Sequence, residues 1–222
     1  MQRAALPERW YEELLRWFAE QGRRFPWRES TAGWYEILVA EIMLQRTRAE
    51  TVLKIYREFL SRYPTPQELC KADEDDLRSF FKRLGLINRA SRLKHAVCVI
   101  IKRFGGRPPC SADKLKAVPG IGDYIASVLL SRVCGIPTPF VDSNVVRVMS
   151  RVLGVTGRFS DVKEVVEKAI AESVPSELLV DVNTAIIDLA ALICKPRRPR
   201  CGQCPLRNVC IQGRSRGEVK LT

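Results

Sequence analysis

Hydrophobic residues recur along this chain at the three- and four-residue spacing of α-helices, and the alternating pattern of β-strands is almost absent. Segments rich in proline and glycine at residues 63–66, 105–109 and 135–139 interrupt the pattern, as turns between helices do. The chain is therefore predicted to be all-α. The predicted helices cover residues 10–18, 35–47, 49–62, 74–83, 89–104, 112–117, 123–134, 145–153, 162–173 and 181–193.

The composition is that of an ordinary globular protein, with 222 residues of which 46% are hydrophobic and 28% charged. No apolar run approaches the ~20 residues that span a bilayer. Residues 1–20 are too charged for the apolar core of a secretory signal. We therefore expect a cytoplasmic protein that works as a monomer without membrane contact. In that compartment cysteines stay reduced.

Positive charge exceeds negative charge by twelve, since 37 Lys and Arg residues stand against 25 Asp and Glu residues. This excess favours a polyanion as partner, nucleic acid before an anionic membrane, and in a prokaryotic cell it implies association with the nucleoid. A basic surface without a partner is the alternative. The one histidine, His95, lies in a basic helical stretch and is interpreted as a surface or packing residue. Imidazole chemistry is therefore not expected.

Four of the eight cysteines fall within seventeen residues near the C-terminus. Four thiolates this close in a reducing compartment indicate a metal centre, and their spacing leaves zinc and a [4Fe-4S] cluster both open. The other four, at positions 70, 98, 110 and 134, are expected to be packed or idle thiols. The predicted metal ligands are Cys194, Cys201, Cys204 and Cys210.

The segment between the first two of these ligands carries four cations and two prolines in six residues. A loop held by a metal centre would present those cations in a fixed array, which suits contact with phosphates. A solvated loop without a ligand is the alternative. The cations are Lys195, Arg197, Arg198 and Arg200.

A tight turn of sequence Val118-Pro119-Gly120-Ile121-Gly122 separates two predicted helices. Its glycines allow positive φ and close approach of the backbone, and the second helix begins with free N–H groups. A turn of this kind binds phosphate. An ordinary connection between helices is the alternative.

Three carboxylates stand alone in apolar sequence. Glu41 is the one polar residue between positions 37 and 44, so loss of solvation is expected to raise its pKa, as a proton donor or acceptor near neutral pH requires. A buried Glu satisfied by a helix end is the alternative. Asp142 precedes a predicted helix, where it would serve as an N-cap and stay ionised. Asp188 is the third, and the residues alone do not rank them.

Together these motifs resemble the helix-hairpin-helix base-excision DNA glycosylases that carry a C-terminal iron-sulfur cluster, the superfamily of endonuclease III. The resemblance runs from about Trp17 to Cys210 and includes the hairpin, the Val141-Asp142-Ser143-Asn144 segment and the cysteine pattern. It implies [4Fe-4S] rather than zinc. It also implies two helical lobes, a barrel over 27–139 with the hairpin and a cluster domain of 1–26 plus 140–222, with the active site in the cleft.

Within that superfamily the second position after the hairpin's last glycine sorts the chemistry. Lyases similar to endonuclease III carry a Schiff-base lysine there, adenine glycosylases typically a serine, and archaeal-type G/T mismatch thymine glycosylases a tyrosine. This chain has Tyr124, which forms no Schiff base. Glu41 is shared with the adenine and thymine mismatch enzymes. The resemblance therefore implies a monofunctional DNA glycosylase of base excision repair, acting on double-stranded DNA that contains a mismatched or damaged base.

The resemblance also suggests roles for individual residues. Asp142 would stabilise the oxocarbenium-like sugar and orient or deprotonate water, Glu41 would assist departure of the base, and Tyr124 would line the pocket. Asn144 would orient the carboxylate or a phosphate. Gln45 and Arg46 would fill the vacated stack or contact the orphan guanine, unless they are ordinary surface residues. Thymine or uracil opposite guanine is the expected target. Adenine or a damaged base is the alternative, and a non-catalytic, structure-specific DNA-binding protein is the second.

Overall fold

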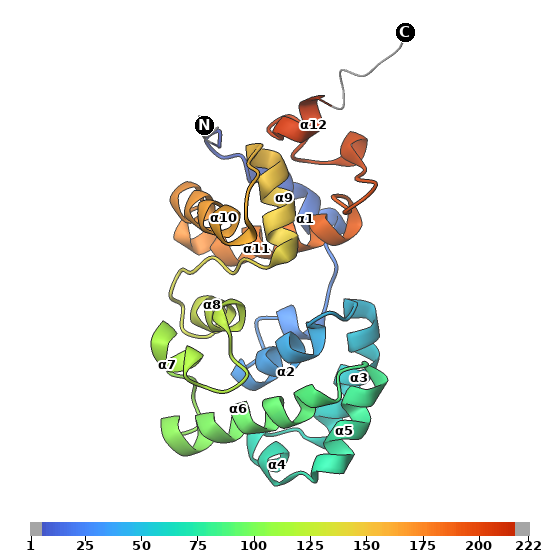
Figure 1. Cartoon of the computed structure of the whole chain (residues 1–222), viewed down its shortest axis with the longest axis vertical. Helices are drawn as coiled ribbons and strands as arrows, with labels where there is room; N and C mark the ends of the chain where they lie inside the picture. The colour runs from blue at the N-terminus through green and yellow to red at the C-terminus, as the bar shows by residue number, and fades with distance from the viewer. Residues whose placement is uncertain (1–5, 216–222) are drawn as a thin grey trace. The chain divides into compact units, whose positions relative to one another are not determined.

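The computed structural model describes residues 6–215, in which every regular element is helical (Figure 1). The all-α prediction is confirmed, and none of the helices described is long and apolar enough to cross a membrane. The α-helices are α1 (Glu12–Gln21), α2 (Trp34–Leu44), α3 (Ala49–Arg62), α4 (Pro66–Lys71), α5 (Glu74–Arg83), α6 (Asn88–Phe104), α7 (Ala112–Lys116), α8 (Asp123–Arg132), α9 (Ser143–Leu153), α10 (Phe159–Ser173), α11 (Leu179–Leu192) and α12 (Ile211–Ser215). Three short 3₁₀ helices accompany them, η1 (Pro26–Arg28), η2 (Ser176–Leu178) and η3 (Cys201–Gln203).

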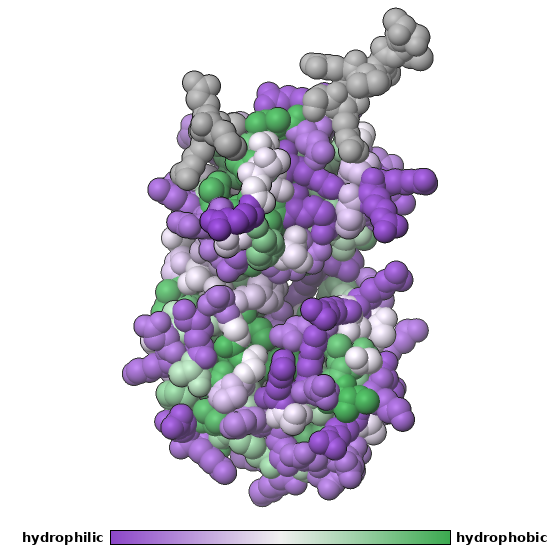
Figure 2. All heavy atoms as spheres, viewed as in Figure 1, coloured by the Kyte–Doolittle hydropathy of each residue, from purple (hydrophilic) through white to green (hydrophobic). Residues whose placement is uncertain are grey.

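The chain divides into two compact units. The hairpin unit is Arg24–Ile136 and contains η1 and α2 to α8. The cluster unit is Met1–Arg23 with Pro137–Thr222, and its described part contains α1 and α9 to α12. The resemblance placed the two boundaries at 26/27 and 139/140. Figure 2 shows hydrophilic side chains spread over the visible face of each unit, with hydrophobic side chains scattered among them.

The hairpin unit is built around α2, which packs against η1, α3, α6 and α8. Ile37, Leu38 and Ile42 are buried on this helix, and Glu41 among them is only half-buried. A helix that is apolar on nearly every side belongs in a core. It therefore holds Glu41 at a fixed place at the edge of that core.

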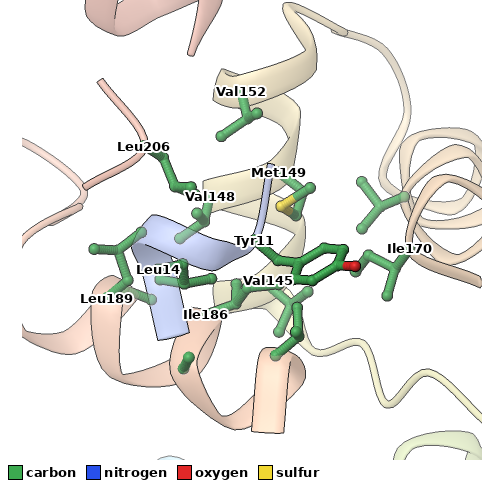
Figure 3. Packing of buried hydrophobic residues seen from close by; sticks show 14 of the residues in the cluster. Tyr11, Leu14, Val145, Val148, Met149, Val152, Ile170, Ile186, Leu189 and Leu206 are labelled. Carbon is green, nitrogen blue, oxygen red and sulfur yellow. The ribbon is translucent and has the colours of Figure 1, made fainter. Parts of the chain in front are cut away.

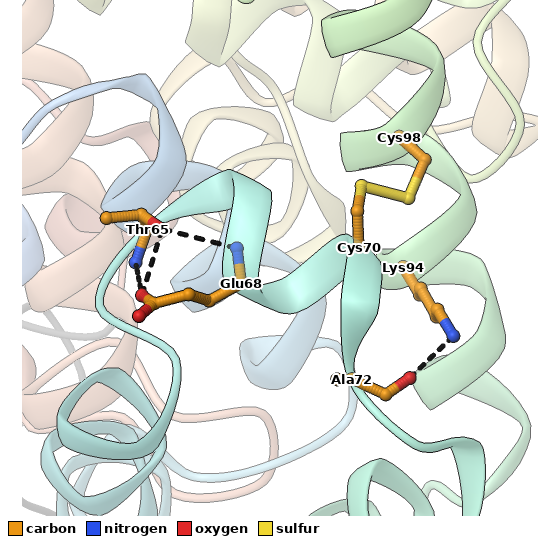
Figure 4. Close-up of a disulfide and its surroundings, with 6 residues drawn as sticks. All are labelled: Thr65, Glu68, Cys70, Ala72, Lys94 and Cys98. Atoms are coloured by element: carbon orange, nitrogen blue, oxygen red, sulfur yellow. Dashed lines mark hydrogen bonds between the residues drawn. A yellow bond between two sulfur atoms is a disulfide. The ribbon is translucent and has the colours of Figure 1, made fainter.

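The short helix α4 was not predicted from the sequence, since six residues are too few for a clear periodicity. Its start is fixed by a capping box in which Thr65 Oγ1 accepts from the Glu68 N–H and the Glu68 carboxylate accepts from the Thr65 N–H (Figure 4). Pro66 occupies the first helical position. This combination is a known signal for a helix N-terminus and would have located α4.

The prediction of idle thiols is wrong for the four scattered cysteines, because they form two disulfides. Cys70 of α4 is bonded to Cys98 of α6 (Figure 4), and Cys110 is bonded to Cys134. The Cα atoms lie 5.5 and 5.6 Å apart, the usual separation for a disulfide. The partners are 28 and 24 residues apart in sequence, and only the packing of the helices brings them together.

The core of the cluster unit forms around α9, which packs against α10, α11 and α12 (Figure 3). Val145, Val148 and Met149 are buried on one side of α9 and meet apolar side chains of α1 and α11. Leu206, from the loop that carries the cysteines, is buried in the same core. The cysteine loop is thus anchored to the helices that follow Asp142.

Candidate active site and cluster loop

Asp142 is the N-cap of α9, as predicted. Its Oδ1 accepts hydrogen bonds from the backbone N–H groups of Asn144 at 2.9 Å and Val145 at 2.8 Å. Its Oδ2 accepts from the Asn144 side-chain amide at 2.7 Å. The carboxylate is half-buried and fixed on both oxygens.

Asn144 and Arg147 continue these contacts toward the cysteine loop. Asn144 Oδ1 accepts from Arg147 Nη1 at 3.0 Å, and the same guanidinium donates to the carbonyls of Ala190 and Cys194 at 3.2 Å each. Ala190 and Cys194 lie more than forty residues along the chain from Arg147, so no local pattern predicts these two contacts. Through Arg147 the start of α9 is connected to the end of α11.

Arg151, one helical turn beyond Arg147, holds the cysteine loop directly. Its guanidinium donates to the carbonyls of Lys195 at 2.9 Å and Pro196 at 2.7 Å, and to Cys194 Sγ at 3.3 Å. Two spaced cations inside the apolar pattern of residues 145–153 are the signal that could have found this pair. Helix α9 therefore has Asp142 at its start and, in its last turn, the arginine that holds the cysteine loop.

The four predicted metal ligands come together. Cys194, Cys201, Cys204 and Cys210 line one cavity, with Arg151 and Arg207 among its other residues. Burial raises the pKa of Cys204 to about 11, with the neighbouring cysteines adding to the effect, and burial also raises the pKa of Cys210. A metal centre beside these thiols would favour the thiolate form that binds it.

The arrangement of these cysteines fits an iron-sulfur cluster. In the part of the chain that the structure describes, no group of three or more His, Cys, Asp or Glu side chains is placed to hold a metal ion. Four thiols around one shared cavity are nevertheless the donor set of a polynuclear cluster. A backbone donor to sulfur also fits such a cluster, because the Gly213 N–H donates a hydrogen bond to Cys210 Sγ at 3.2 Å.

The four cations of the cysteine loop are all exposed, and the backbone that carries them is held in place. Besides the contacts from Arg151, the N–H groups of Lys195 and Arg200 donate to the Ile193 carbonyl at 2.8 and 3.0 Å. Among the described residues none of the four forms an ion pair with a carboxylate. Their contact with DNA stays a prediction.

In the hairpin unit, Arg132 of α8 interacts electrostatically with both Glu41 and Tyr124. Burial lowers the pKa of Arg132, and the negative charge of Glu41 opposes that shift. Tyr124 is half-buried in the first turn of α8. The structure thus adds a half-buried cation, missed from the sequence, to the two predicted residues of this unit. The raised pKa of Glu41 stays a prediction.

The hairpin joins α7 to α8, and its residues divide into two groups. The side chains of Val118 and Ile121 are buried, so Val118 can meet DNA only through its backbone. Pro119, Gly120 and Gly122 are exposed. Gly120 has φ +92°, a conformation that requires glycine. The exposed backbone of this turn is free to approach a phosphate.

Gln45 is the C-cap that follows α2, and its carbonyl accepts a hydrogen bond from Arg89 Nη1. Arg46 follows with φ 59°, which is uncommon for a residue other than glycine, and its side chain is exposed. The structure therefore presents Arg46 at the surface on a tightly defined turn. Whether either residue enters the DNA stack stays a prediction.

Asp188 is separated from this chemistry. It is fully buried and accepts hydrogen bonds from the Arg23 backbone N–H at 2.6 Å, Nε at 3.0 Å and Nη2 at 2.7 Å. Arg23 belongs to the same unit. Asp188 therefore has a structural task as the buried partner of Arg23.

Residues 39–176 match the HhH-GPD superfamily of base excision DNA repair proteins, and residues 194–210 match the iron-sulfur binding domain of endonuclease III. The chain belongs to the HhH-GPD superfamily, and its cofactor is a [4Fe-4S] cluster. The resemblance seen in the sequence is confirmed, and zinc is set aside.

Among its relatives, the thymine-DNA glycosylase of Aeropyrum pernix is 39% identical over 89% of this chain and 91% of its own. The thymine/uracil-DNA glycosylase of Pyrobaculum aerophilum is 36% identical over 94% of this chain and 93% of its own. The human adenine DNA glycosylase is 32% identical over 89% of this chain and 38% of its own. The solved structure of a thermostable thymine-DNA glycosylase matches with a TM-score of 0.80 at 31% identity, covering 91% of this chain and 94% of that one. Family and relatives make the chain an enzyme of the DNA glycosylase type.

Proposed function

We propose that the protein is a monofunctional glycosylase that acts as a monomer on double-stranded DNA and removes thymine or uracil opposite guanine. The observation that carries this proposal is Tyr124 at the second position after Gly122, where a phenol replaces the amine that a lyase needs for a Schiff base. Identity to thymine and thymine/uracil glycosylases along nearly the whole chain supports the choice of base.

The reaction begins with extrusion of the target nucleotide, which costs a few kcal/mol and least at a mismatch. Asp142 then stabilises the positive charge that develops on the sugar and orients water. A carboxylate has about four lone-pair sites. Oδ1 accepts two hydrogen bonds and Oδ2 one, so Oδ2 retains a site for water or for the sugar.

The second group of residues acts on the leaving base. Glu41 assists its departure, and the charge of Arg132 nearby keeps that carboxylate oriented. Tyr124 lines the pocket for the extruded nucleotide. The [4Fe-4S] cluster, held by the four cysteines, supplies structural support to the loop with its four cations. No redox turnover is required.

A panel of duplexes tests the substrate. T, U, A and oxidised bases are placed opposite G and other partners, and the products are divided between samples with and without alkali. We expect cleavage after alkali for T and U opposite G. Strand breaks without alkali would show a lyase instead.

The variant Asp142→Asn tests the mechanism. Asparagine caps a helix about as well as aspartate, so the fold should persist while base release falls by at least ~100-fold. Binding to a G·T duplex should remain measurable. Asp181→Asn, which alters an exposed carboxylate of the same unit, is the matched control. Undiminished excision by Asp142→Asn removes Asp142 from the mechanism.

Removal of adenine is the second candidate, favoured by the adenine DNA glycosylases among the relatives. Its signature in the same panel is release of A opposite G or oxidised G, with T and U left in place. Binding without release of any base would indicate a non-catalytic DNA-binding protein.

A further inference from the structure

We propose that Arg46, Arg89 and Arg92 form a subsite for backbone phosphate of the bound DNA, separate from the hairpin turn and from the cysteine loop. The inference deepens the proposed function and rests on it to the extent that DNA is the ligand. It concerns how the duplex is held, and not which base is removed.

The three arginines come from two segments of the hairpin unit. Arg46 lies in the link between α2 and α3, whereas Arg89 and Arg92 lie three residues apart near the start of α6 and share one side of that helix. They are close enough to affect one another. Burial lowers the pKa of Arg89, and the positive charges of Arg46 and Arg92 lower it further.

This charge is not balanced within the protein. In the chain from residue 6 to 215, none of the three arginines forms an ion pair with a carboxylate, whereas Arg83 of the same unit pairs with Glu58 at 2.7 Å. The first turn of α6 contains no acidic residue, although negative charge is favoured at that end of a helix. An anion from outside the protein would therefore stabilise these three cations.

The backbone that carries Arg46 is also held in a defined position. Arg89 Nη1 donates to the Gln45 carbonyl, which fixes the turn that presents Arg46. Arg46 itself has φ 59°. Left-handed backbone at a non-glycine residue is strained and is concentrated at functional sites. Arg46 and Arg92 are exposed, so a polymer backbone lying on the surface can reach both.

The hairpin turn lies beside Arg92, one of these three arginines. A Cβ built on Gly120 would be 3.4 Å from the Arg92 carbonyl oxygen, so the turn is packed against the backbone of α6 at Arg92. Two features that favour phosphate, exposed hairpin backbone and unpaired arginines, are therefore adjacent within one unit. Adjacent phosphates of one DNA strand are the ligand that matches them.

The double variant Arg46→Gln with Arg92→Gln tests the subsite, because it removes two charges and leaves Arg89 on Gln45. Its control is Lys102→Gln with Arg103→Gln, which removes two exposed charges from the last turn of the same helix. Binding of an undamaged labelled duplex is measured by fluorescence anisotropy between 50 and 200 mM salt. Circular dichroism checks that both proteins are folded, and the single variants repeat the test if the double variant is not.

We expect the Arg46/Arg92 variant to bind DNA roughly tenfold more weakly than the wild type. The slope of log K against log salt concentration should become shallower by about 1 to 2, because each lost phosphate contact reduces it by about one. The control should change by less than half as much. Methylphosphonates placed singly along the duplex should weaken the wild type at one or two positions and leave the variant unaffected there. Equal losses in variant and control, or no such position, would overturn the proposal.

These measurements need no base release. A wild type that fails to remove T or U opposite G refutes the proposed substrate while the salt and methylphosphonate results still decide the subsite. Failure of the subsite alone leaves excision of T or U intact.

Discussion

At the scale of single residues, three carboxylates that look alike in sequence have different surroundings. Asp188 is fully buried beside a half-buried Arg23, whereas Asp142 and Glu41 are half-buried. Water reaches the last two and not the first. Burial and partners therefore divide them into one structural residue and two candidates for chemistry.

The variant Asp188→Asn should destabilise the protein by about 3 kcal/mol, because it leaves the charge of Arg23 without its buried partner. Urea unfolding followed by circular dichroism measures the change. Asp181→Asn on the same helix α11 is the control and should stay within about 0.5 kcal/mol of the wild type. Equal stability of the two variants would contradict a structural role for the pair.

The local roles at this scale could be predicted from the sequence and the distant ones could not. The N-cap at Asp142 needs only the next three residues, so the pattern before α9 was sufficient. Arg147, Arg151 and Arg132 act on groups elsewhere in the fold. Their partners are set by packing, which no spacing in the sequence encodes.

At the scale of elements, strong periodicity predicted the long helices, while α4 and the pairing of four cysteines needed other information. For α4 the signal existed in Thr65, Pro66 and Glu68. For the disulfides, the assumption of a reducing compartment led to the wrong prediction of free thiols. Disulfide-rich intracellular proteins do occur in hyperthermophiles, so compartment alone is a weak guide to cysteine pairing.

Removing either disulfide should destabilise the hairpin unit by about 3.5 kcal/mol in the chain-entropy description, since each closes a loop of similar length. The variants are Cys70→Ser with Cys98→Ser and Cys110→Ser with Cys134→Ser, compared with the wild type in urea. The second pair encloses α7, the hairpin and α8, so its loss should also loosen the turn.

A variant without all four of these cysteines controls for effects on the cluster. Dithiothreitol should lower the stability of the wild type to that of this variant and leave the variant itself unchanged. An equal drop in both proteins would place the effect of the reductant elsewhere.

At the scale of the whole molecule, the cluster belongs to one unit only. Its loop sends Leu206 into the core around α9, and α12 packs on α9 as well. The sequence predicted a metal centre and its four ligands, because four cysteines within seventeen residues are a local pattern, and the family resemblance implied [4Fe-4S] rather than zinc. It could not indicate that the loop shares a core with the helix that Asp142 caps.

Loss of the cluster should therefore unfold one unit before the other. In Cys204→Ser we expect iron content to fall and amide hydrogen exchange in α9 and α11 to accelerate by on the order of 100-fold, while α2 and α6 keep their protection. Mass spectrometry measures iron and exchange in the same samples. Equal loss of protection in both units would contradict this separation.

The cap that Asp142 places on α9 has a practical consequence. Because an asparagine can take over the cap, Asp142→Asn should keep the fold, and under the proposed mechanism it should bind its target DNA while releasing the base far more slowly. Fragments of genomic DNA retained by such a protein, once sequenced, would report which base pairs it selects in their natural context.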